Sequence, residues 1–155
     1  MATGTGKVYT RTISNVFGGA DAGDSYSSDF LSNTIKVALM AATYTPNQNT
    51  DELWSAISSN ELANGNGYTT GGETLGSKTV TEGTNSVIFD TTATTVWTAT
   101  GGDIGPASYA VVYDSTTGIL LSYIDFSGSP QTATDGNTLT ITWDATNGVF
   151  KGTTS

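Results

Sequence analysis

The chain has 155 residues, of which 36% are hydrophobic and only 12% are charged, and its net charge is −9. A chain of this length can bury a core as one domain. An acidic protein is repelled by an anionic membrane surface. Nucleic-acid binding needs a basic stripe, which cannot be built from the five cations Lys7, Arg11, Lys36, Lys78 and Lys151. We therefore expect neither nucleic acid nor a membrane among the partners.

The sequence contains no cysteine and no histidine. Disulfides and thiolate metal sites are thereby excluded, and the usual general base and commonest zinc ligand are missing. We expect no cofactor, no metal and no enzymatic activity, because no pattern in the chain would activate a nucleophile. No apolar run approaches the roughly 18 residues of a membrane span, and the N-terminus lacks the hydrophobic segment of a secretory signal.

Residues 1–30 are rich in Gly, Ser, Thr and Asp and predict an extended N-terminal arm, followed by a β-sandwich domain over residues 31–155. A short strand is compatible with residues 8–13. Such an arm can bind a partner by strand addition, which needs backbone hydrogen bonds and a few apolar anchors; a frayed terminus is the alternative. The candidate interface residues are Val8, Tyr9, Arg11, Ile13 and Phe17.

The stretch from residue 33 to 62 predicts a strand, a bend and the one helix of the chain. Apolar residues alternate over 35–42, which indicates a strand buried on at least one face. Thr50 is a suitable N-cap for a helix over residues 51–62, and Asp51 and Glu52 would complement the helix dipole in its first turn.

The remainder of the chain predicts strands and turns. Residues 74–81 and 86–90 form one expected hairpin, and residues 107–114 and 119–126 form the clearest one, placed centrally because both strands are nearly continuous in apolar residues. Residues 137–144 alternate cleanly, and Val149 to Lys151 would pair back on them after the Asn147-Gly148 turn. The expected fold is all-β, an antiparallel β-sandwich (jelly-roll-like or Ig-like) of about seven or eight strands with one short α-helix.

Several polar and aromatic residues are candidates for chemistry, and each has a structural interpretation that we prefer. Asp90, Asp114, Asp125 and Asp144 lie near strand ends, where carboxylates commonly form turns. The Asn47-x-Asn49-x-Asp51 spacing resembles the start of a calcium loop but lacks its later Gly and Glu. Trp97 and Trp143 are in phase with apolar neighbours and are predicted to lie in the core, whereas Trp54 leaves a sugar-stacking platform open as an alternative.

An ordered set of motifs extends the interpretation beyond these residues. It comprises NTIKVALM (33–40), YTPNQNTDE (44–52), Leu53-Trp54, NEL (60–62), GYTTGGETL (67–75), VIFD (87–90), Trp97, YAVVY (109–113) and LSYIDF (121–126). Over roughly residues 30–152 the chain thereby resembles a family of small tailed-bacteriophage virion proteins, encoded among head and tail genes. The family offers no catalytic residues.

The resemblance implies a structural protein of the virion, and together with the aromatic residues it leaves three hypotheses. The first is a capsid decoration (cement) protein that binds the outer shell. Its partners would be the major capsid protein and itself, as a homotrimer, in a virion assembled in the host cytoplasm, where the absence of cysteine is suitable. The alternative is a tail or fibre-associated component, and the second alternative is a carbohydrate-binding module.

Overall fold

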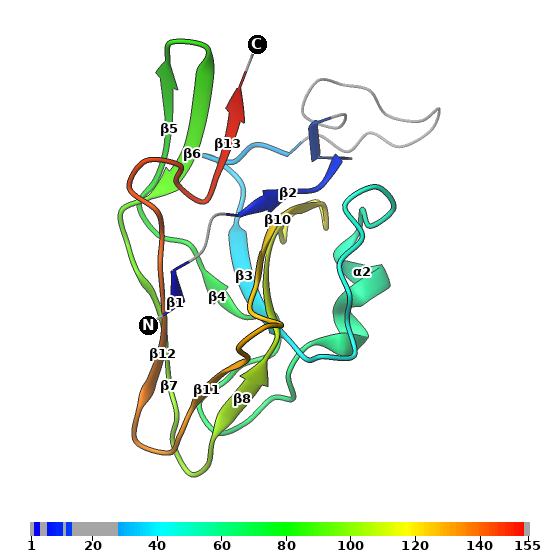
Figure 1. Cartoon of the computed structure of the whole chain (residues 1–155), viewed down its shortest axis with the longest axis vertical. Coiled ribbons are helices and arrows are strands. Elements are labelled where there is room, and N and C mark those ends of the chain that lie inside the picture. The colour runs from blue at the N-terminus through cyan, green and yellow to red at the C-terminus, as the bar shows by residue number, and fades with distance from the viewer. Residues whose placement is uncertain (1, 4–5, 11, 14–27, 154–155) are drawn as a thin grey trace.

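The computed structural model describes residues 2–3, 6–10, 12–13 and 28–153, and these residues form an all-β fold with mostly antiparallel strands and little helix (Figure 1). The predicted fold class, all-β, is confirmed. The strands are shorter and more numerous than expected, and several have only two to four residues.

A five-stranded sheet forms the centre of the molecule, with the order β2-β10-β9-β3-β4. Its strands are β2 (Lys7–Val8), β3 (Ile35–Met40), β4 (Glu73–Thr74), β9 (Tyr109–Asp114) and β10 (Leu120–Asp125). All six residues of β9 are buried. Strands buried on both faces are near-continuous in apolar residues, so the composition of β3, β9 and β10 places them at the centre.

Each face of this sheet contributes to a separate apolar cluster. On one face, Val37, Val112 and Leu121 belong to a cluster that includes Trp97 and Ile141. These last two lie on a second sheet of order β1-β12-β7, formed by β1 (Ala2–Thr3), β7 (Thr95–Thr98) and β12 (Thr138–Thr142). The two sheets therefore share one core. Strands β8 (Ile104–Ala107) and β11 (Gln131–Ala133) form a further two-stranded sheet.

The opposite face of the five-stranded sheet is rich in tyrosine. Its cluster contains Tyr9, Ala38, Met40, Tyr44, Ile57, Tyr109, Val111, Tyr113, Leu120 and Tyr123, with Trp54 packed against it. The helix α2 (Trp54–Ile57) and the loop before it contribute to this cluster, so the segment from residue 41 to 62 covers this face of the sheet.

A fourth sheet, with the order β13-β6-β5, projects from the body at one end (Figure 1). Its strands are β5 (Lys78–Gly83), β6 (Ser86–Thr91) and β13 (Phe150–Thr153). We call it the projecting sheet. Five of the six residues of β5 are exposed, in contrast to the fully buried β9.

Both predicted hairpins are present. Strand β9 pairs with β10, and β5 pairs with β6 in a register that runs from Lys78 opposite Thr91 to Gly83 opposite Ser86. Asn85 has a φ of 57° in the tight turn of the β5–β6 hairpin, a left-handed conformation that Asn tolerates better than most residues. Asn85 therefore suits the turn of the β5–β6 hairpin.

The predicted helix is wrong in its start and its length. α2 begins at Trp54 and is followed by the 3-10 turn η1 (Ser58–Asn60), without a side-chain N-cap. The Asp51 carboxylate accepts hydrogen bonds from the Tyr44 hydroxyl (2.8 Å) and the Asn47 amide (2.9 Å) instead. The backbone after it pairs with the β9–β10 hairpin, where the Leu120 amide donates to the Glu52 carbonyl at 2.8 Å.

The expected return of residues 149–151 to residues 137–144 is also wrong. β12 pairs with β7 and β1, whereas β13 pairs with β6. The Asp144 carboxylate accepts hydrogen bonds from the amides of Thr146 and Asn147, which closes a small loop before the chain crosses to β6. The predicted Asn147-Gly148 turn is therefore present, but it connects β12 of one sheet to β13 of another.

Candidate interaction surface

The described residues of the N-terminal segment pack on the domain. β2 pairs with the edge of β10, with Val8 opposite Ser122, and β1 pairs in parallel with β12. Residues 12 and 13 are helical, so the strand compatible with residues 8–13 stops early. Described residues on both sides of residue 30 thus pack against the same sheets, and the expected division at residue 30 stays a prediction.

The five predicted interface residues differ in how far they are buried, and two of them lie outside the described residues. Tyr9 is fully buried in the tyrosine-rich cluster and is not available to a partner in this structure. Val8 is half-buried, and Ile13 is 56% exposed. Arg11 and Phe17 lie outside the described residues. The structure thus leaves Val8 and Ile13 as accessible apolar side chains of this set.

Tyr9 is held by a chain of buried hydroxyl groups. The Tyr44 hydroxyl donates to Asp51, so the 2.8 Å contact between the two tyrosine hydroxyls has Tyr9 as the donor. Burial raises the pKa of Tyr9 and of Tyr44 well above the usual range for a phenol. The Thr10 amide also donates to the Gln48 carbonyl at 2.8 Å. The loop of residues 44–51 therefore holds the N-terminal segment against the sheet.

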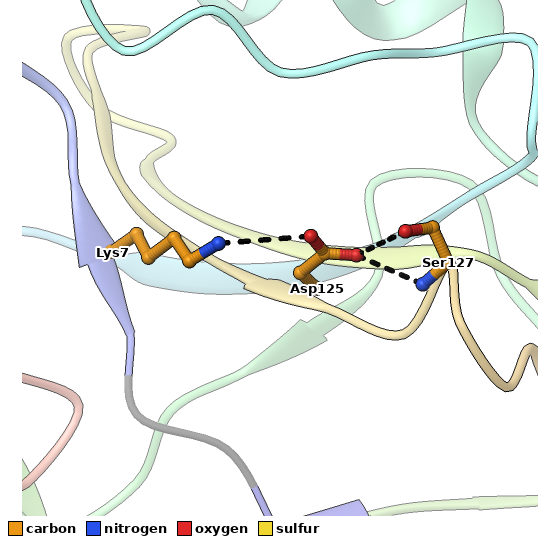
Figure 2. A network of polar contacts seen from close by, with 3 residues as sticks. All are labelled: Lys7, Asp125 and Ser127. Carbon is orange, nitrogen blue, oxygen red and sulfur yellow. Dashed lines mark hydrogen bonds and ion pairs between the residues drawn. The ribbon is translucent and has the colours of Figure 1, made fainter.

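A weaker contact fixes the start of the same segment. Lys7 Nζ lies 3.7 Å from a carboxylate oxygen of Asp125, and the Ser127 amide and hydroxyl donate to the other oxygen at 2.9 and 2.6 Å (Figure 2). The two hydrogen bonds from Ser127 hold the pKa of Asp125 below its usual value, and the positive charge of Lys7 adds a smaller effect in the same direction. The Lys7 side chain is 52% exposed and that of Asp125 is 35% exposed, so solvent screens the ion pair.

An apolar groove of about 450 Å³ lies between the N-terminal segment and the projecting sheet. One wall is formed by Val8, Thr12 and Ile13, and the other by Ser86, Val87, Phe89, Phe150, Lys151, Gly152 and Thr153. The rings of Phe89 and Phe150 stack at 4.5 Å between centroids. This groove joins two of the predicted interface residues to a sheet that the sequence did not single out.

The carboxylates at the strand ends form turns, as predicted for Asp114, Asp125 and Asp144. Asp114 is fully buried, and it also accepts hydrogen bonds from Ser28 Oγ and Asn33 Nδ2, both at 2.7 Å. In the part of the chain that the structure describes, no group of three or more acidic side chains is placed to hold a metal ion. Asn47 and Asp51 close the bend of their own loop, which agrees with the preferred interpretation of the calcium-like spacing.

The three tryptophans differ in their burial and contacts. Trp97 and Trp143 are buried, with 1% and 8% of their surface exposed, as predicted. Trp54 stacks on Tyr113 with 4.2 Å between centroids and 8° between planes, and burial raises the pKa of Tyr113 to about 12. One face of the Trp54 ring is therefore already covered by protein, which weakens it as a sugar platform.

A second pocket of about 230 Å³ is lined by residues 62–66, Tyr68 and residues 103–105. The Asn66 side chain donates to the Asp103 carbonyl across it, and the Tyr68 hydroxyl donates to Glu61 at 2.7 Å. The side chains of Asn66 and Tyr68 are therefore already hydrogen-bonded within the protein.

The comparisons with known proteins give no match. No protein-family model, no curated protein and no solved structure matches the chain. In the described residues, no helix has the length and apolar character needed to cross a membrane. The candidate surface therefore has to be argued from its own geometry.

Proposed function

We propose that the protein is a structural component of a tailed-bacteriophage virion and that it decorates the capsid as a cement protein. The sequence resemblance supplies the class, and the observation that carries the interaction is the apolar groove beside the projecting sheet. Apolar side chains exposed in a groove favour a protein partner, and the net charge of −9 favours a basic one. The partner in this proposal is the major capsid protein.

The role proposed is binding and not catalysis. In a cement protein, binding energy stabilises the shell because the bound form of the shell is favoured by mass action. The homotrimer, the location in the virion and the assembly in the host cytoplasm belong to the same proposal. Trimer formation would be seen as a threefold mass in sedimentation of the purified chain.

The test uses Ile13 and a matched control. Ile13 is 56% exposed at the groove, and Leu31 is 52% exposed but does not line it. Ile13→Asp should reduce binding to undecorated shells at least about tenfold by placing a charge in an apolar contact, whereas Leu31→Asp should bind as the wild type does. Equal binding by both variants and the wild type would contradict the groove as the docking site.

A tail or fibre position is the second candidate, because the same groove could face a tail protein. Separating heads from tails of disrupted particles and probing each fraction for the chain decides between the two positions. Recovery with heads supports decoration, recovery with tails supports the alternative, and absence from both fractions contradicts the virion proposal. A glycan array with wild type and Trp54→Ala tests the carbohydrate-binding alternative.

A further inference from the structure

The outer edge of the projecting sheet is formed by strand β5, which ends the order β13-β6-β5. Among the described residues, β5 therefore has a strand partner on one side only. The Thr92 amide donates to the Ser77 carbonyl, which fixes the phase of the ladder with β6. Because hydrogen-bonded pairs alternate along an antiparallel ladder, Thr79 and Thr81 point their backbone groups toward β6. Those of Lys78, Val80 and Glu82 point outward.

The side chains of these three outward-pointing residues share one face of the sheet, since side chains alternate along a strand. Val80 is 37% exposed, which makes it one of the few exposed large apolar residues in the described part of the chain. Lys78 is half-buried, and its Nζ donates to the Asn33 carbonyl. Glu82 is exposed. The edge therefore has a cation, an apolar residue and an anion at alternate positions.

We infer that β5 pairs antiparallel with β5 of a second copy of this chain, about a twofold axis at Val80. In this register Val80 lies opposite Val80 of the second copy, and Lys78 lies opposite Glu82 of the second copy. The twofold axis repeats that ion pair on the other side. The outward-pointing backbone groups of all three residues fall in hydrogen-bonded positions, so one register satisfies both the backbone and the side chains.

This self-complementarity identifies the partner of β5 as a second copy of the same strand. A C2 interface uses the same patch on both subunits, and a strand with opposite charges placed symmetrically about an apolar centre matches itself. The two projecting sheets would join into one continuous sheet, which removes two open edges that otherwise promote irregular association. The pairing is small and therefore weak in dilute solution.

Weak pairing gains strength where copies are held side by side. On a decorated shell, attachment would raise the effective concentration of neighbouring copies, so a weak twofold contact would link them. This consequence rests on the proposed function, but the pairing itself does not. A purified chain in solution tests the pairing alone, so its failure would leave the shell-binding proposal untouched.

The experiment is a charge-swap series followed by sedimentation velocity at increasing protein concentration. The wild type should shift reversibly toward twice the mass that it has in dilute solution. Glu82→Lys and Lys78→Glu each place like charges opposite each other twice, and each should raise the dissociation constant of this contact at least about tenfold. The double variant Lys78→Glu/Glu82→Lys should restore the wild-type value.

Mixing the two single variants is the decisive arm. In a mixed pair every opposed position again carries opposite charges, so the mixture should associate although neither variant does so alone. Glu73→Lys changes the same charge on β4, an exposed position at another sheet edge, and should behave as the wild type does. Circular dichroism of each variant checks the fold, since Lys78 also contacts Asn33. A wild-type mass that does not rise with concentration, or a mixture that does not associate, would overturn the inference.

Discussion

Strand β9 of the five-stranded sheet and strand β5 of the projecting sheet both have six residues, but they differ in what covers them. β9 has six buried residues between two apolar clusters, whereas β5 has five exposed residues and one free edge. The sequences show the reason: β9 reads YAVVYD and β5 reads KTVTEG. A strand that is apolar on both faces forms the scaffold, and a polar strand with one apolar residue is free to meet a partner.

The largest expected effect comes from making the same change in each sheet. Val112→Ala removes buried methyl groups from β9, where the side chain is fully buried, and should lower the free energy of unfolding by about 2 to 3 kcal/mol. Val80→Ala in the partly exposed β5 should cost less than about 1 kcal/mol. Urea denaturation of both variants measures the difference, and equal losses would contradict the division into scaffold and free sheet.

An intermediate effect is expected at the hydroxyl chain that joins the N-terminal segment to the scaffold. Tyr9→Phe removes the hydroxyl that donates to Tyr44 and should cost about 1 kcal/mol at neutral pH. The folded-state pKa values of Tyr9 and Tyr44 lie above the unfolded value, so this stabilisation is fully present below pH 10. It is lost as the pH rises above about 10, because only the unfolded state ionises there.

The pH dependence gives the measurement for that prediction. Each tyrosine kept neutral by folding contributes a loss of about 1.4 kcal/mol per pH unit above pH 10. The free energy of unfolding of Tyr9→Phe should therefore fall less steeply than that of the wild type between pH 10 and 11. Identical slopes would contradict the prediction that folding raises the pKa of the Tyr9 hydroxyl.

The smallest effect is expected at Lys7, where the N-terminal segment meets β10 at the surface. The Lys7 side chain is 52% exposed in its ion pair with Asp125. Lys7→Ala should therefore change the free energy of unfolding by less than about 0.5 kcal/mol, and the change should shrink further in high salt. Thermal unfolding at low and high ionic strength checks it; a large, salt-independent loss would assign Lys7 a packing role.

The parts of the fold that the sequence could predict were those set by neighbouring residues. The β9–β10 hairpin followed from two apolar runs around one Gly-containing turn. The start of the helix was not predictable in this way, because Asp51 is committed to Tyr44 and Asn47 in the folded bend. The pairing of β13 with β6 joins residues about sixty positions apart, and no local pattern specifies it.

The candidate site was predicted only in part, for a similar reason. Val8 and Ile13 were recognised as apolar residues in a polar segment, and both line the groove. Tyr9 looked the same in sequence, but its partner Tyr44 is 35 residues away and buries it. The alternation of Lys78, Val80 and Glu82 is visible in the sequence. Its meaning depends on β5 being an edge, which only the sheet order reveals.

Amide hydrogen exchange, measured residue by residue at low and high protein concentration, tests the central claim most directly. The claim is that β9 serves as scaffold while the free edge of β5 is an interaction surface. The amides of Val80 and Glu82 should exchange rapidly in dilute protein and become protected as the concentration rises, while those of β9 stay protected throughout. Exchange at Val80 that is slow in dilute protein, or that does not change with concentration, would contradict the account.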